Sequence, residues 1–79
     1  MDSNLTNHVR RWRKARGMTQ IDLASRTGIT RQSVIAIEKG RLNPSIAVVL
    51  AMAATLEVSV EELFSLSPPP PGEVHASPE

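Results

Sequence analysis

Apolar residues recur at helical spacing near the start of the chain. Leu5, Val9 and Trp12 fall at i, i+4 and i+7, which places them on one face of a helix predicted from about residue 4 to 15. Gly17 ends this helix in the prediction, because glycine enters the left-handed conformation beyond a C-terminus without steric penalty. The first helix is therefore expected to pack this face against a core.

Two short helices separated by a glycine turn come next. The first is predicted over residues 20–26, with Thr19 as its N-cap and Asp22 in the capping-box position. The second is predicted over residues 31–38, after a turn that contains Gly28. Two helices joined by so short a turn form a helix-turn-helix, the motif that places its second helix in the major groove of DNA.

Two further helices complete the predicted domain. One runs over residues 46–56 behind Ser45 as N-cap, and a short one follows Val58 with a capping box from Ser59 to Glu62. These five segments predict an all-α fold of five helices over residues 1–66. Four consecutive prolines then open a polar segment, so residues 67–79 are predicted to be a Pro-rich flexible tail.

Charge is distributed unevenly along the chain. All nine Lys and Arg residues lie between Arg10 and Arg41, where there are only two acids, giving a net charge of +7. From residue 42 to the end there are five Glu and no Lys or Arg, giving −5. A concentrated basic segment suits a polyanion such as DNA, although a solvated helical surface has the same composition. Charge alone leaves both interpretations open.

Several classes of function are disfavoured by what the sequence lacks. It contains no cysteine, no Asp or His pair at metal-ligand spacing, and no serine with a histidine base in reach. We therefore expect no enzyme activity, no cofactor, no metal and no small-molecule ligand. No apolar run approaches the roughly 18 residues of a membrane span, and the N-terminus does not resemble a signal peptide. A cytoplasmic location is expected.

The second helix of the motif is predicted to have an apolar side and a polar side. Thr30, Val34 and Ile37 fall on the side predicted to face the core, and a polar, partly cationic side lies opposite. The candidate base-reading residues on or beside that outer side are Arg31, Gln32, Ser33 and Ala36. Arg can read guanine and Gln adenine, while a methyl group can contact thymine. The candidate phosphate-binding residues are Gln20, Lys39, Arg41 and Asn43, which would fix register rather than read sequence.

Four stretches of the chain resemble the Cro/C1-type (XRE family) helix-turn-helix regulators, and their compact single-domain members in particular. They are residues 17–24, 28–40, 43–45 and 56–64. The resemblance implies a lambda-repressor-like, five-helix DNA-binding domain. It also implies DNA contacts from Gln20, from residues 31–33 and from Ala36, and a partly buried ion pair between Arg13 and Glu38.

The predicted helix over residues 46–56 departs from the family pattern, which has polar residues on the outer side. Here that side is assigned to apolar residues, namely Ala47, Val48, Ala51 and Ala54. One interpretation is that alanine stands there because it favours helix, but the apolar width of this helix favours a protein–protein surface. Glu57 stands where the family often has glycine, which predicts a strained or differently capped turn.

The sequence therefore predicts a sequence-specific transcriptional regulator, a repressor that binds a palindromic operator as a homodimer. The alternative is an antitoxin-type or other protein-interaction module that binds a partner protein and autoregulates its operon. A steep salt dependence of DNA binding would favour the regulator, and co-purification of a second small protein would favour the alternative.

Overall fold

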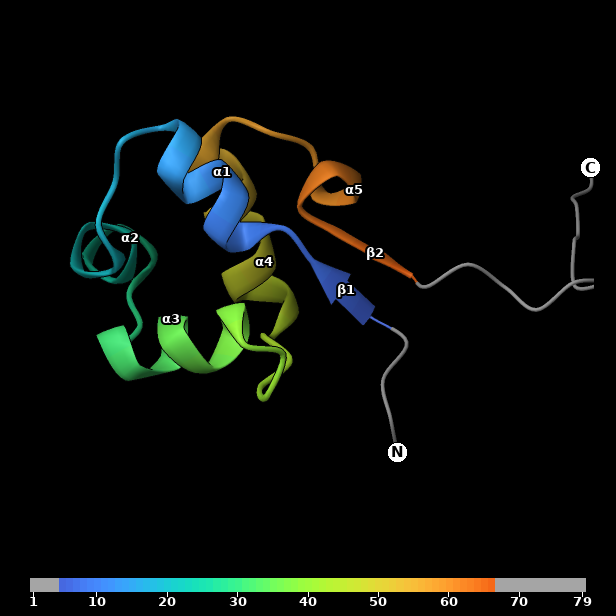
Figure 1. Ribbon diagram of the computed structural model, residues 1–79, viewed down its shortest axis with the longest axis horizontal. Helices are drawn as coiled ribbons and strands as arrows, with labels where there is room; N and C mark the ends of the chain where they lie inside the picture. Colours follow the sequence, from blue (N-terminus) through green and yellow to red (C-terminus); the bar gives the residue numbers. More distant parts are fainter. Residues whose placement is uncertain (1–4, 67–79) are drawn as a thin grey trace, which may run out of the picture.

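The computed structural model describes residues 5–66 of the 79-residue chain, so the predicted tail over residues 67–79 lies outside the described residues. Five helices and two short strands make up this part (Figure 1). The helices are α1 (Val9–Ala15), α2 (Gln20–Thr27), α3 (Arg31–Glu38), α4 (Ile46–Leu56) and α5 (Val60–Leu63). The strands are β1 (Leu5–Asn7) and β2 (Phe64–Leu66).

Helices α2 to α5 begin where the sequence predicts them to begin, because each of these four has a side-chain cap. The hydroxyls of Thr19, Thr30 and Ser45 each accept a hydrogen bond from the backbone N–H three residues later. Ser59 and Glu62 form the predicted capping box of α5, and Thr19 forms a second one with Asp22. Hydrogen bonds from the backbone and then the side chain of Thr19 hold the pKa of Asp22 below its usual 3.8.

The predicted start of the first helix is wrong, since residues 5–7 form strand β1. This strand pairs antiparallel with β2, with Leu5 opposite Leu66 and Asn7 opposite Phe64. The pairing satisfies backbone groups that a helix would satisfy locally, and His8 N continues it by donating to Leu63 O at 2.8 Å. The fold is therefore all-α apart from one two-stranded ribbon among the described residues.

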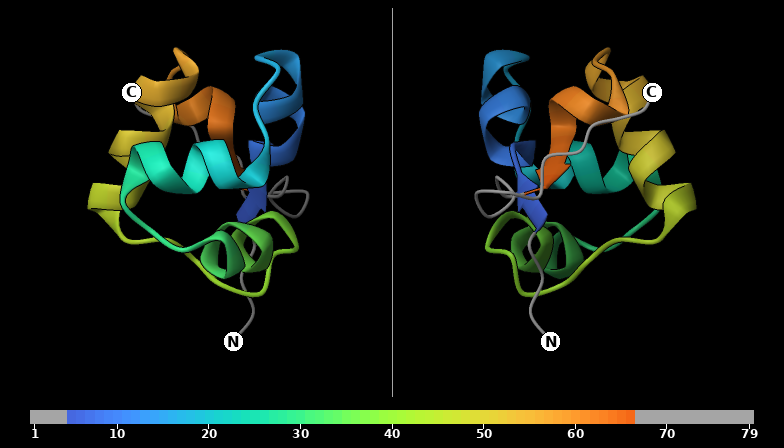
Figure 2. Two further views of the ribbon diagram at one scale, coloured as in Figure 1. Left: turned by 90° about the vertical axis from the view of Figure 1, so that its left-hand side faces the viewer. Right: turned by 90° about the vertical axis from the view of Figure 1, so that its right-hand side faces the viewer.

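The core draws on every helix, and Figure 2 shows the helices arranged around it. Its buried apolar residues are Val9, Leu23, Ala24, Val34, Ile37, Met52, Ala53, Leu56, Leu63 and Phe64. The buried side of α2 is centred on Leu23 and Ala24, whereas Ile21 lies outside that stripe and is 63% exposed.

Helix α4 ends in an unusual backbone conformation. Glu57 has φ 59°, and it is the only non-glycine residue with positive φ in the described part of the chain. Left-handed backbone suits glycine better than any residue with a Cβ. Arg16 supports this end of the helix, because its Nε donates to Leu56 O at 2.7 Å. The altered turn expected at Glu57 is thus a left-handed cap stabilised from α1.

Replacing Glu57 by glycine is expected to stabilise the protein. Glycine removes the strain of the left-handed conformation, and this gain exceeds the cost of its extra freedom in the unfolded chain. The free energy of unfolding should therefore rise by about 0.5–1 kcal/mol. Glu57→Ala is the matched control, because it removes the same carboxylate but keeps a Cβ. Urea unfolding should separate the two variants; equal stability of both would mean that the gain, if any, comes from charge.

Candidate nucleic-acid interface

Helix α3 lies at the lower edge of the molecule in Figure 1 and buries only one side. Val34 and Ile37 are fully buried, whereas Arg31 and Gln32 are exposed at the N-terminal end. Thr30 was expected to face the core but is exposed, because as N-cap its hydroxyl turns back to accept from Ser33 N at 3.0 Å. The long polar side chains of this helix therefore stand free at the end that enters a groove.

An ion pair between Arg13 and Glu38 joins α1 to α3. Arg13 Nε lies 2.7 Å from Glu38 Oε2, and the two side chains are only 8% and 3% exposed. Arg13 Nη2 donates to the second carboxylate oxygen at 3.3 Å, and Arg13 Nη1 donates to Met18 O at 2.8 Å. Such a bidentate pair fixes distance and angle together, so it sets how α3 sits on the domain.

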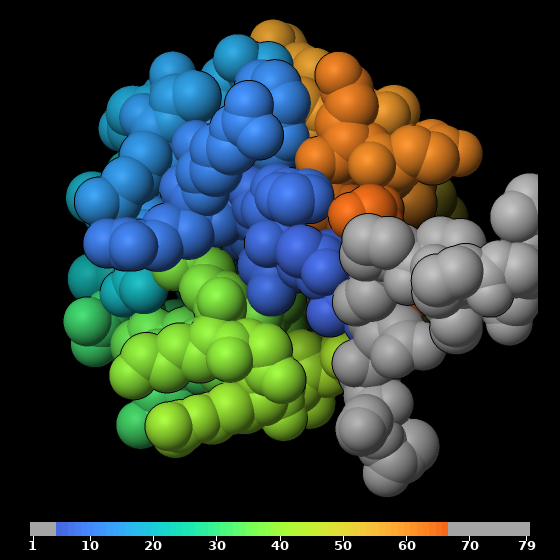
Figure 3. All heavy atoms as spheres, turned by 45° about the vertical axis from the view of Figure 1, so that its right-hand side comes forward, coloured from blue at the N-terminus to red at the C-terminus, as the bar shows by residue number. Residues whose placement is uncertain are grey.

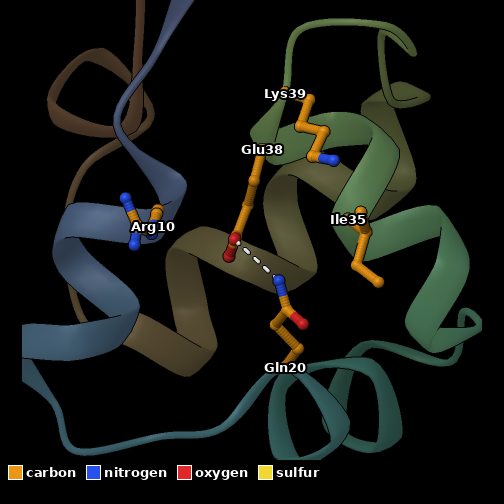
Figure 4. Close-up of a pocket in the computed structure, with 5 residues that line it drawn as sticks. All are labelled: Arg10, Gln20, Ile35, Glu38 and Lys39. Atoms are coloured by element: carbon orange, nitrogen blue, oxygen red, sulfur yellow. Dashed lines mark hydrogen bonds between the residues drawn. The ribbon is translucent and has the colours of Figure 1, made fainter.

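Two further hydrogen bonds hold α3 from other elements. Gln20 Nε2 donates to Glu38 Oε1 at 3.2 Å, which ties the start of α2 to the ion pair (Figure 4). Asn7 Nδ2 donates to Ile37 O at 2.9 Å, which ties strand β1 to a carbonyl at the C-terminal end of α3 that also accepts from Gly40 N at 3.0 Å. Sequence reasoning missed the role of Asn7, because nothing near it in the sequence signals a contact 30 residues away.

A hollow of about 320 Å³ opens beside α3. Its lining residues come from α1, α2 and the C-terminal half of α3 with its cap: Arg10, Gln20, Ile35, Glu38 and Lys39 (Figure 4). In the space-filling view, the green residues of α3 and of the loop that follows it occupy the lower part of the face, below the blue residues of α1 (Figure 3).

Comparison with known proteins identifies this arrangement. A sequence model of the protein family described as helix-turn-helix matches residues 9–63. The chain belongs to this helix-turn-helix family. The earlier resemblance to the Cro/C1-type (XRE) regulators is confirmed, and the fold is that of a helix-turn-helix DNA-binding domain.

Two relatives are named as HTH-type transcriptional regulators. That of Methanothermobacter thermautotrophicus is 44% identical over 59 residues, which cover 73% of this chain and 86% of the relative. That of Methanocaldococcus jannaschii is 37% identical over 60 residues, which cover 76% of this chain and 91% of the relative. The chain is a transcriptional regulator with a helix-turn-helix domain, a class of DNA-binding proteins rather than of enzymes.

Solved structures share the fold at similar identity. The restriction-modification controller protein C.AhdI from Aeromonas hydrophila is 33% identical with a TM-score of 0.66, over 70% of this chain and 83% of that one. The N-terminal DNA-binding domain of SinR from Bacillus subtilis is 31% identical with a TM-score of 0.64, over 68% and 80% of the two chains.

The predicted phosphate-binding residues of this helix-turn-helix regulator lie at the hollow and in the loop that follows α3. Gln20 and Lys39 line the same hollow beside α3. Arg41 and Asn43 are exposed in the loop between α3 and α4, where Arg41 N donates to Ala36 O at 2.8 Å. The contacts of these four residues with DNA remain predictions.

The outer side of α4 differs from the prediction in three residues, since it lacks Val48 and gains Ile46 and Leu50. Val48 is partly buried and packs against the core, because it lies next to the buried stripe of the helix. Ile46 and Leu50 are exposed instead, by 74% and 57%. The α4 apolar face, as the structure defines it, consists of the residues Ile46, Ala47, Leu50, Ala51 and Ala54.

Other kinds of site find no support in the described residues. Among residues 5–66, no three His, Cys, Asp or Glu side chains come together as metal ligands would. In the same range, every helix falls short of the length and apolarity needed to cross a bilayer.

Proposed function

We propose that this regulator represses transcription by binding a palindromic operator as a homodimer, with the N-terminal half of α3 reading bases. The observation that carries the proposal is the exposure of Arg31 and Gln32 at the free end of a helix whose other end is fixed. That fixing comes from Glu38 and from Asn7. Because α3 is held rigidly at this end, Arg31 and Gln32 stay aligned with the base edges.

Each base-reading side chain has its own chemistry. Arg31 can donate two hydrogen bonds to guanine, and Gln32 can donate to and accept from adenine. Ser33 is half-buried, and its oxygen accepts from Thr30 Oγ1 at 3.0 Å, which leaves the hydroxyl proton for an acceptor on DNA. Ala36 offers only a methyl group, which suits the methyl of thymine.

Backbone contacts would come from the charged and polar residues that flank α3. Gln20 begins α2, where free backbone N–H groups favour a phosphate. Lys39, Arg41 and Asn43 follow α3 and are exposed. Contacts of this kind supply affinity and register without sequence information, and they make binding weaken steeply with salt.

A second copy of the chain would complete the site. The α4 apolar face leaves large aliphatic side chains in water, and a two-fold dimer through it would cover them. Such a dimer presents two copies of α3 to half-sites one helical turn apart, which makes the operator palindromic. Occlusion of a promoter is the simplest route to repression. In a bacterium or an archaeon the place of action is the cytoplasm.

Arg31→Ala and Gln32→Ala are expected to change the sequence preference of the protein and leave its fold intact. Both side chains are exposed, so their removal opens no cavity. Each should relax selectivity at its own base pair, by about 1–3 kcal/mol. Selection from a random-duplex library by the wild type and each variant measures this, with Arg26→Ala as the charge-matched control. Identical enriched sequences from all four proteins would contradict the assignment of base contacts.

The exposed α4 apolar face also suits a different protein, as an antitoxin-type module would require. Purification of the chain from its own host separates the two possibilities. A homodimer runs alone at twice the mass of the chain, whereas an antitoxin-type module carries a second polypeptide in fixed ratio. Loss of that polypeptide on replacing Leu50 would place it on the same face.

A further inference from the structure

The hollow between α1, α2 and α3 contains charges that base reading does not use. Arg10 from α1 is exposed on one side of it, and Lys39 at the end of α3 is exposed on the other, on the same side as Ile35 (Figure 4). At about 30 Å³ per water molecule, its volume of about 320 Å³ has room for roughly ten waters. A phosphate group with its sugar fits in that space.

The carboxylate at the hollow does not cancel the charge of these two cations. Glu38 is already paired through both oxygens with Arg13, at 2.7 and 3.3 Å, and it also accepts from Gln20 at 3.2 Å. Within residues 5–66 this is the only ion pair, so no carboxylate of that part of the chain is paired with Arg10 or Lys39. The hollow is therefore positively charged, because its one carboxylate is paired with Arg13 and its two flanking cations are unpaired. An anion is the ligand that fits it.

The hollow also has the right position for a DNA strand. Ile35 and Lys39 are one turn apart on the flank of α3 that faces α1 and α2, next to the outer side that carries Gln32 and Ala36. When a helix lies in the major groove, the sugar–phosphate strand that borders the groove passes along such a flank.

We infer that a backbone phosphate of the bound duplex occupies this hollow, held by Arg10 and Lys39, with the sugar against Ile35. Arg10 is then a DNA-contacting residue supplied by α1, outside the two helices of the motif. This inference rests on the proposed function, since it requires α3 to lie in the groove. It assigns Arg10 and Ile35 to the interface in addition to the residues that sequence reasoning selects.

The test pairs Arg10→Ala with a scan of the operator in which methylphosphonate neutralises one phosphate at a time. The wild type should lose roughly three- to tenfold in affinity at one phosphate of each half-site. Arg10→Ala should bind the unmodified duplex more weakly than the wild type does, and it should lose less than the wild type at that phosphate, because only Lys39 still holds it. The slope of log K against log salt should fall by about one. Arg26→Ala removes the same charge outside the hollow and should keep the wild-type scan.

Ile35 provides an independent arm of the test. Ile35→Glu and Ile35→Gln place side chains of nearly equal size in the hollow and differ by one negative charge. With a phosphate seated there, Ile35→Glu should bind the duplex roughly tenfold more weakly than Ile35→Gln. Thermal unfolding of both variants shows whether the difference arises from the fold.

An Arg10→Ala scan identical to that of the wild type, with an unchanged salt slope, would overturn the inference. Saturable binding of inorganic phosphate at the hollow, seen by NMR at the Arg10 and Lys39 side chains and not displaced by the duplex, would overturn it in favour of a free anion. A wild type that enriches no sequence contradicts the proposed function instead, and the Arg10→Ala slope on any duplex still tests the hollow.

Discussion

Arg13→Met is expected to destabilise the regulator by about 3–5 kcal/mol, a large share of the total stability of a small domain. The substitution leaves the Glu38 carboxylate, only 3% exposed, without its cation. It also removes the donor to Met18 O. Urea unfolding followed by the fluorescence of Trp12, the one tryptophan of the chain, measures the loss.

The double variant Arg13→Met/Glu38→Leu shows how much of the loss comes from the unpaired Glu38 charge and how much from the missing side-chain contacts. Removing both charges leaves no buried unpaired ion, so the double variant should recover much of the stability that Arg13→Met loses. If Arg13→Met does not fold, the stability of the double variant can still be compared with that of the wild type. Single and double variants all within 1 kcal/mol of the wild type would show that this ion pair does not hold α3 in place.

Leu50→Gln is expected to dissociate the proposed homodimer. Each residue of a two-fold interface occurs twice, and a dimer can bury only the exposed part of Leu50. Replacing it therefore removes about 2–3 kcal/mol of dimer stability and raises the dimer Kd roughly 30- to 160-fold. Leu50 is already 57% exposed within one protomer, so the monomer fold should not change. Sedimentation should then report a single chain of 8.6 kDa, and operator affinity should fall because the two half-sites are no longer bound together.

Ile21→Gln is the matched control for this experiment. Ile21 is similarly exposed, at 63%, but lies on α2, away from the α4 apolar face. The control variant should sediment as the wild type does. A wild type that is monomeric at all accessible concentrations would contradict the dimer, and a wild type and Leu50→Gln that form equally stable dimers would place the interface elsewhere.

The helix starts could be predicted because their causes are local. Thr19, Thr30, Ser45 and Ser59 each cap the helix that directly follows, and a cap acts over three residues. Strand β1 could not be predicted in the same way. Its partner lies almost 60 residues away, and the spacing of Leu5, Val9 and Trp12 fits a helix when only neighbouring residues are considered.

The site was predictable where side chains point into solvent and less so where they meet one another. Exposure of Arg31 and Gln32 follows from helical periodicity. The bond between Gln20 and Glu38 and the hollow with Arg10 depend on how three helices converge, which no local pattern reports. On α4, nearly every residue is apolar, so the sequence marks no boundary between faces, and Val48 was assigned to the wrong one.

The most direct test of sequence-specific binding by α3 is a comparison of two dissociation constants at physiological salt. One is for the duplex enriched from the random library, and the other is for a scrambled duplex of the same composition. The account predicts that the enriched duplex binds at least about 10³-fold more tightly. Equal affinity for the two duplexes would contradict it, since a protein that holds only phosphates does not distinguish them.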